Sequence, residues 1–143
     1  MKRASVPLIL IALAVAAFLG YRLSTHDDAA AGKRPPCLRG RAPARADFPA
    51  GLPVPSHLVV RRRYVLRGTP VTESYVPGTL RSVRDWYFRA LSRSGFELVG
   101  GDAEEFEAET DFVRGSVRGH LKLNHSAACP GALSVAVVDR TPR

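Results

Sequence analysis

Two neighbouring segments in which polar and apolar residues alternate constrain the fold of this chain most strongly. The first, residues 105–113, sets one face against another: Phe106, Ala108, Thr110 and Phe112 against Glu105, Glu107, Glu109 and Asp111. The second, residues 117–124, does the same: Val117, Gly119, Leu121 and Leu123 against Arg118, His120, Lys122 and Asn124. A period of two residues is that of a β-strand with one buried face. The segments therefore predict two strands with an apolar inner face and a charged outer face.

The dipeptide Gly115-Ser116 between these segments predicts how they pair. A two-residue type II′ turn takes glycine at its first central position, because φ is positive there. The resulting register sets Phe112 opposite Gly119, which fills the core with a ring beside a glycine. On the outer face it brings opposite charges together, in the pairs Asp111–His120 and Glu109–Lys122. Such cross-strand pairs contribute up to about 1 kcal/mol each, so the turn, the core and the charges predict one hairpin.

An amphipathic helix is expected upstream, over residues 79–95. Its apolar residues recur with helical period as one stripe: Leu80, Val83, Tyr87, Ala90 and Leu91. Thr79 can cap the start, and Gly95 can take the left-handed conformation that ends a helix. This helix is expected to be the only cover of one sheet face.

Four further segments have the β-branched and apolar content of strands, at residues 57–66, 71–76, 96–99 and 133–138. Turns are expected at Gly68-Thr69-Pro70 and at Gly100-Gly101-Asp102. In the first strand, simple alternation places Arg62 on the same face as Val60. The sequence predicts an α+β, two-layer domain, in which one antiparallel sheet of about five to six strands is covered by the single helix.

The first 23 residues have the form of a signal-anchor. A basic start, Met1-Lys2-Arg3, precedes an uncharged run, and residues 4–23 are just long enough for a transmembrane helix of about 20 residues. The small residues Ala14 and Ala16 leave open a cleaved signal and a secreted protein. The chain therefore divides into four parts: an anchor at 1–23, a Pro/Ala/Arg-rich linker at 24–47, the α+β domain at 48–140 and a tail at 141–143.

The orientation of the anchor is left open by its flanking charges. Counting Lys and Arg on both sides places the C-terminal side in the cytoplasm, whereas the short basic N-terminus and Asp27-Asp28 favour export. The two cysteines favour export too. Cys37 and Cys129 have no zinc-ligand spacing, and two loop cysteines in an exported protein predict one disulfide. Two unrelated thiols, or an intermolecular bond through Cys37, are the alternatives.

The net charge of +8 raises the question of nucleic acid or anionic lipid as a partner. Residues 1–46 hold eight Lys or Arg against two Asp, so most of the excess lies outside the domain. In the domain, the arginines of the helix fan around its exposed arc instead of forming one row. Nucleic acid is therefore not favoured. A cytosol-facing module that binds anionic lipid or nucleic acid through its arginines is the alternative.

No motif for catalysis, metal binding or a cofactor is present, so no enzyme and no cofactor are expected. His120 beside Asp111 resembles two members of a catalytic triad, but an exposed cross-strand pair is the favoured interpretation. The expected role is non-catalytic binding of another envelope protein or a cell-wall component. The predicted partner surface is the acidic row of the outer face, which consists of Glu105, Glu107, Glu109 and Asp111.

The pattern Trp86-Tyr87-Phe88-x-x-Leu91-x-x-x-Gly95-Phe96 resembles a known helix-to-strand signature, "FYxxxLxxxGW". The signature is found in many small exported or membrane-anchored bacterial domains of unknown function. The resemblance extends over residues 54–138. It implies an α+β domain of the cell envelope and carries over no catalytic residue, because the signature concerns packing alone.

Overall fold

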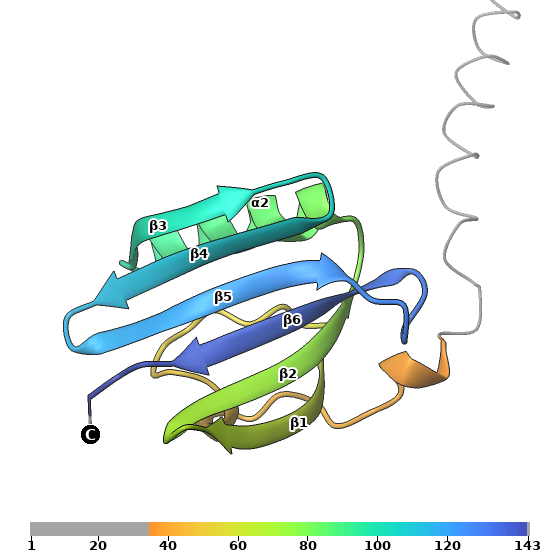
Figure 1. The fold of residues 1–143 in the computed structure, drawn as a ribbon, viewed down its shortest axis with the longest axis horizontal. Helices are drawn as coiled ribbons and strands as arrows, with labels where there is room; N and C mark the ends of the chain where they lie inside the picture. Colours follow the sequence, from red (N-terminus) through yellow and green to blue (C-terminus); the bar gives the residue numbers. More distant parts are fainter. Residues whose placement is uncertain (1–34, 143) are drawn as a thin grey trace, which may run out of the picture. The chain divides into compact units, whose positions relative to one another are not determined.

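The computed structural model describes residues 35–142, which form one antiparallel sheet of six strands with one α-helix against it (Figure 1). The strands are β1 Val59–Leu66, β2 Thr69–Pro77, β3 Glu97–Ala103, β4 Glu107–Arg114, β5 Val117–His125 and β6 Ala132–Asp139. The helix is α2, Leu80–Arg93, and two short 3-10 turns come first, η1 Pro36–Leu38 and η2 Arg45–Asp47. These elements confirm the α+β class.

The predicted membrane segment lies outside the described residues. Between residues 35 and 142, no helix combines the length and the apolar character that crossing a bilayer requires.

The strand order is β1-β2-β6-β5-β4-β3, so the last strand of the chain lies in the middle of the sheet. Strand β6 pairs with β2 on one side and with β5 on the other, both antiparallel. Its inner face is completely buried, through Leu133, Val135 and Val137. This closure joins the N-terminal hairpin β1–β2 to the C-terminal hairpin β4–β5 in one core.

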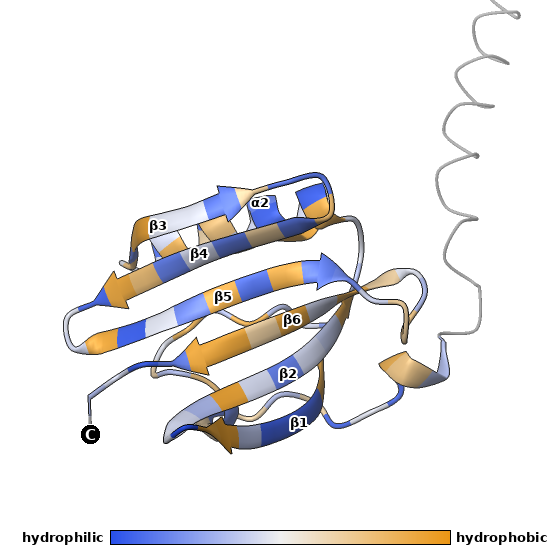
Figure 2. Cartoon of the chain, in the orientation of Figure 1, coloured by the Kyte–Doolittle hydropathy of each residue, from blue (hydrophilic) through white to orange (hydrophobic). Residues whose placement is uncertain are grey.

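The hairpin β4–β5 has the register that its turn predicts. Arg114 pairs with Val117, Phe112 pairs with Gly119, and Gly115 has a φ of 59°. Figure 2 shows hydrophobic and hydrophilic bands alternating along β4 and β5. The apolar bands face α2, where the ring of Phe112 is fully buried and meets Phe96 edge-on.

Helix α2 begins and ends as its terminal residues predict. The hydroxyl of Thr79 accepts a hydrogen bond from the backbone N–H of Ser82 at 3.2 Å. Gly95 follows the helix with a φ of 77°. The predicted stripe is the buried face: Leu80, Val83, Tyr87, Ala90 and Leu91. This face packs on β3, β4 and β5, which is only one half of the sheet.

The second half of the inner face is covered by an irregular segment, which we call the N-terminal arm (residues 35–58). Phe48, Leu52 and Leu58 of the arm belong to the same core cluster as α2. Upstream of them, Arg41 forms a β-bridge with Val60 beside the edge strand β1. Residues 35–47, which the sequence assigns to a linker, are therefore packed against the sheet, and the expectation of a single cover is corrected.

A β-bulge in β1 reverses the predicted face of three residues. The pairing with β2 shifts between Val60 and Arg62, which leaves Arg61 as the extra residue. Val60 points into the core opposite Ser74, whereas Arg62 lies opposite Glu73 on the other face. One inserted residue changes the phase of all that follow, because strand side chains alternate with a period of two. Tyr64 and Leu66 consequently lie on the outer face.

The glycines at the start of the predicted turn 100–102 belong instead to strand β3. The strand continues to Ala103, with a register shift between Leu98 and Gly100. At Gly101, φ is 141°, and an added Cβ would lie 2.2 Å from the carbonyl oxygen of Glu109. The glycine is therefore needed for the close approach of β3 to β4.

The longer β3 moves the turn before β4 to residues 104–106. Glu104 donates its backbone N–H to the carbonyl of Glu107 at 2.8 Å. Phe106 lies in this turn and is 66% exposed, so its predicted place on the core face is wrong. At the other hairpin, the turn is made by Arg67 and Gly68, and Pro70 already pairs within β2.

A buried carboxylate fixes the N-terminal arm to the sheet. Asp47 is 9% exposed and accepts two hydrogen bonds from the guanidinium of Arg41, at 2.7 and 2.8 Å. It also accepts the backbone N–H of Ala44 at 2.8 Å, and its own carbonyl accepts the hydroxyl of Thr72. The hydrogen bonds from Arg41 hold the pKa of Asp47 below its usual value.

Replacing this carboxylate, Asp47→Asn, should lower the free energy of unfolding at pH 7 by about 1 kcal/mol, because a charge-assisted pair is lost while the half-exposed Arg41 is screened by water. A depressed pKa contributes stability above the unfolded pKa of about 4 and loses it as the pH falls through the folded pKa. The difference between wild type and variant in urea titrations should therefore shrink between pH 7 and pH 3. An equal difference at both pH values would contradict this role.

Candidate functional site

The outer face of the sheet, opposite α2, is the surface that the sequence predicted as a binding site. Its centre is strand β6, where the outward side chains are small: Ala132, Ser134, Ala136 and Val138. Larger charged side chains of β4 and β5 lie on one side of this strand and those of β1 and β2 on the other. The outer face therefore has small side chains along its middle and larger charged side chains on both sides.

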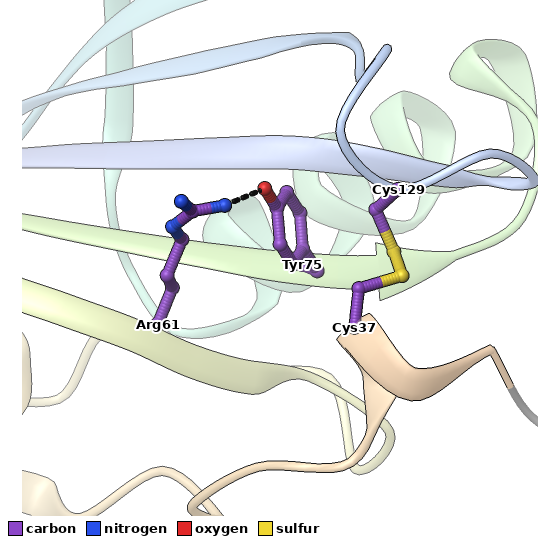
Figure 3. The surroundings of a disulfide bond; sticks show 4 residues. All are labelled: Cys37, Arg61, Tyr75 and Cys129. Carbon is purple, nitrogen blue, oxygen red and sulfur yellow. Dashed lines mark hydrogen bonds between the residues drawn. A yellow bond between two sulfur atoms is a disulfide. The ribbon is translucent and has the colours of Figure 1, made fainter.

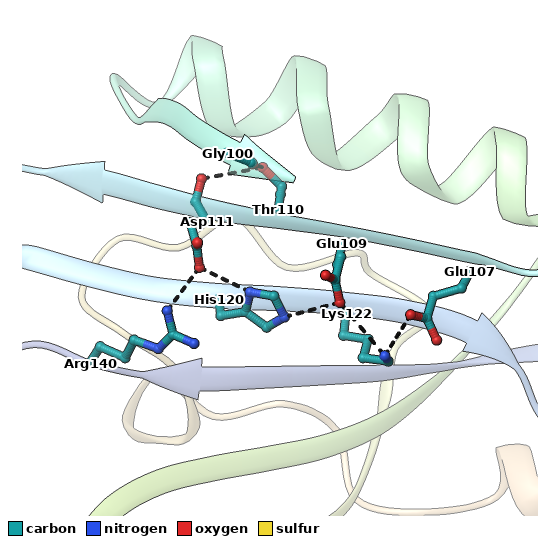
Figure 4. Close-up of polar contacts among 8 residues, drawn as sticks. All are labelled: Gly100, Glu107, Glu109, Thr110, Asp111, His120, Lys122 and Arg140. Carbon is teal, nitrogen blue, oxygen red and sulfur yellow. Dashed lines mark hydrogen bonds and ion pairs between the residues drawn. The ribbon is translucent and has the colours of Figure 1, made fainter. Parts of the chain in front are cut away.

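On one side of β6, side chains of β4 and β5 and Arg140 after β6 form a continuous series of paired polar groups, which we call the charge ladder (Arg140, Asp111, His120, Glu109, Lys122 and Glu107; Figure 4). Asp111 accepts one hydrogen bond from Arg140 at 3.0 Å and lies 2.9 Å from Nδ1 of His120. Lys122 donates to Glu107 at 2.6 Å and lies 3.6 Å from Glu109. The hydrogen bond to Glu107 raises the pKa of Lys122.

In the charge ladder, the carboxylates of the predicted acidic row have partners within the domain. Glu107, Glu109 and Asp111 do lie together on the outer face, in register with Asn124, Lys122 and His120. Glu105 is not among them, because it precedes β4 in the exposed turn. Each carboxylate of the row has a cationic or imidazole neighbour on the same face. The row is therefore largely neutralised within the domain and presents no uniform negative patch.

His120 bridges two carboxylates. Its Nδ1 faces Asp111, and its Nε2 lies 3.6 Å from Oε2 of Glu109. In a nucleophilic triad, the second ring nitrogen faces a hydroxyl or thiol that it deprotonates. Here that nitrogen faces a second acid, so the pair contributes to the ladder as a cross-strand contact.

On the other side of β6, the outer face of β1 and β2 carries a second cluster of paired side chains. Arg62 donates to both carboxylate oxygens of Glu73, at 2.7 and 3.0 Å, and the hydroxyl of Tyr64 donates to the same carboxylate at 2.8 Å. The guanidinium of Arg62 also lies over the ring of Tyr64. The hydrogen bonds from Arg62 lower the pKa of Glu73, and the bond to Glu73 raises the pKa of Tyr64.

One end of the outer face is closed by the two cysteines (Figure 3). Cys37 of the arm and Cys129 of the β5–β6 loop lie at disulfide distance, with 5.7 Å between their Cα atoms, as the sequence predicted. Cys129 is fully buried and packs with Leu38, Tyr75 and Ala132. The hydroxyl of Tyr75 accepts a hydrogen bond from Arg61. The start of the arm is thereby attached to the outer face of β2.

Several residues of this surface were missed by sequence reasoning. The bulge that turns Arg61 toward Tyr75 and Arg62 toward Glu73 has no local signal, since Arg61-Arg62-Arg63 fits either face. Arg140 lies beyond the last predicted strand and reaches Asp111 only because β6 is next to β5. The pairs Asp111–His120 and Glu109–Lys122 were found, because a two-residue turn fixes their register.

Arg114 is a further residue whose role appears only in three dimensions. Its guanidinium donates to the carbonyl of Ser94 at 3.0 Å and to that of Ala50 at 2.7 Å. It also lies 4.3 Å above the centre of the Phe96 ring. Arg114 thus joins the end of α2 to the N-terminal arm, which is a structural role.

Comparisons with known proteins find no counterpart: no family model, no curated protein and no solved structure matches the chain. Within residues 35–142, no three or more His, Cys, Asp or Glu side chains are arranged to hold a metal ion.

Proposed function

We propose that this chain is an anchored extracytoplasmic binding domain of the cell envelope, held to the membrane by residues 4–23, which acts without catalysis. The observation that carries the proposal is the pairing of Cys37 with Cys129. Disulfides persist in oxidising compartments and are rare in the cytosol. Cys37 follows the expected anchor closely in the sequence. The bond therefore attaches the segment after the anchor to the β5–β6 loop of the domain.

The surfaces of the domain support binding through the sheet. Among residues 35–142, nothing covers the outer face beyond the short segment around Cys37. Four arginines donate within the domain, to Asp47, Glu73, Asp85 and Asp111. Internal pairing favours a protein or cell-wall partner over nucleic acid, because each paired arginine would first have to give up its carboxylate.

The thiol state in the native cells tests the proposal. The protein would be isolated under acid quench, its free thiols labelled, and Cys37 and Cys129 mapped by mass spectrometry with and without reduction. We expect one peptide pair linked through Cys37 and Cys129. Two free thiols in freshly quenched cells would overturn the extracytoplasmic assignment and favour the cytosol-facing module that binds anionic lipid or nucleic acid.

The same sample decides between an anchored and a secreted protein. An intact N-terminal peptide in the membrane fraction is the expected result. A mature N-terminus after Ala16, with the protein in the soluble fraction, would show a cleaved signal instead.

A further inference from the structure

The two edges of the sheet differ in how their backbone is protected. Strand β1 is an edge strand with features that hinder pairing with another strand. Arg41 pairs with Val60, a bulge interrupts the strand at Arg61, and three arginines follow one another. Strand β3 is the opposite edge. Within residues 35–142, no segment pairs with its outer side, and all of its residues except Leu98 are exposed. An exposed edge offers a row of backbone donors and acceptors to another strand.

The side chains of β3 and of the turn that follows it are acidic and apolar. No Lys or Arg occurs between Gly95 and Val113, whereas Glu97 and Asp102 lie on β3 itself. Their pairing with Val113 and Glu109 places both on the outer face of the sheet. Val99 is 52% exposed on the same strand, and Phe106 is exposed in the turn that follows. Unlike the charge ladder, Glu97 and Asp102 have no cation beside them on their own strand.

The edge formed by β3 is hollowed beside α2. A depression of about 520 Å³ lies beside β3, lined by Phe88 of α2, by Leu98 and residues 100–103 of β3, and by Glu109 and Thr110 of β4. Gly101, which lies opposite Thr110 on the helix-facing side, has no side chain to fill it. A strand added outside β3 would therefore place alternate side chains in two environments, one beside Glu97 and Asp102 and one beside Phe88 and Leu98.

We propose that β3 is the docking edge of this domain and that it takes an extended peptide segment in which Lys or Arg alternates with apolar residues. The proposal deepens the binding function proposed above and rests on it. Backbone hydrogen bonds supply the affinity of such strand addition, and the side chains on alternate faces supply the specificity. A second copy of this chain fits less well, because pairing β3 with itself brings Glu97 and Asp102 toward like charges.

The test uses the full-length oxidised chain in a non-ionic detergent and a fluorescent peptide as long as β3, with lysine and valine in alternation. Anisotropy should show saturable binding of this peptide and none of a peptide that alternates glutamate and valine. Hydrogen exchange should show new protection of the amides in residues 97–103 and no change in residues 59–66. Binding without protection of β3, or equal binding of both peptides, would overturn the proposal.

Two variants with the same change in net charge separate a specific site from general electrostatics. Glu97→Gln with Asp102→Asn should weaken the binding of the lysine peptide about tenfold, whereas Val65→Lys with Ala127→Lys, at exposed positions away from β3, should change it less than about twofold. Equal losses in both variants would show a non-specific charge effect. Concentration-dependent protection of β3 without peptide would identify a second copy as the occupant and overturn the peptide proposal.

Failure of the peptide-docking proposal can be distinguished from failure of the proposed extracytoplasmic function. Thiol mapping tests the compartment, and the peptide experiment tests the edge strand in the purified chain, so either can fail while the other succeeds.

Discussion

Removing the link between the two cysteines, by Cys37→Ala with Cys129→Ala, should lower the free energy of unfolding by about 4 kcal/mol. The bond joins residues 92 positions apart. In the chain-entropy model, a bond that closes a loop of this size strongly restricts the unfolded chain. The bond also attaches the N-terminal arm, whose residues Phe48, Leu52 and Leu58 complete the core.

Urea titration of the full-length chain checks this prediction, with the fluorescence of the single tryptophan, Trp86, as the readout. Reduced wild type is the matched control and should unfold at the same urea concentration as the double alanine variant. A variant that is as stable as the oxidised wild type would show that Cys37 and Cys129 contribute nothing through their bond.

Gly119→Val should lower the free energy of unfolding by about 3 kcal/mol, because the core has no room at this position. An added Cβ would lie 2.3 Å from Cζ of Phe112 and 2.7 Å from the carbonyl oxygen of Val138. Phe112 is fully buried and meets Phe96 edge-on, so its ring cannot move aside freely. The same urea titration measures the loss.

Two further variants test the cause. Arg118→Val introduces valine at the neighbouring, exposed position of β5 and should change stability by less than about 0.5 kcal/mol. Phe112→Leu in the Gly119→Val background should recover part of the loss, since the shorter side chain vacates the position of Cζ. Strictly additive effects of the two substitutions would contradict a direct clash between them.

The elements with a local signal were predictable from the sequence. The hairpin β4–β5 was predicted to the residue, because a glycine that requires positive φ, a ring beside a glycine and opposite charges all indicate one register. Helix α2 was predicted with its cap, its end and its buried face for similar reasons. Of the predicted acidic surface, Glu107, Glu109 and Asp111 were placed correctly on one face, while Glu105 was not.

The misplaced residues share one cause, which is that strand phase and length depend on the neighbouring strand. Arg62 lies on the outer face because a bulge at Arg61 shifts the register of β1 against β2. Phe106 lies outside the core because β3 continues through Gly100 and Gly101. There, close contact with β4 replaces the expected turn. Neither event has a signature within a window of a few residues.

The sequence by itself determined the local structure of this protein: which segments are helix or strand, where the β4–β5 turn lies, and which two cysteines are available to pair. The tertiary structure decided the rest. It placed β6 at the centre of the sheet, packed the arm beside β1, paired the acidic row with Lys122, His120 and Arg140, and left β3 as the open edge. The physical reason is that turns, caps and amphipathic periods act over a few residues, whereas strand order and charge pairing depend on segments far apart in the chain.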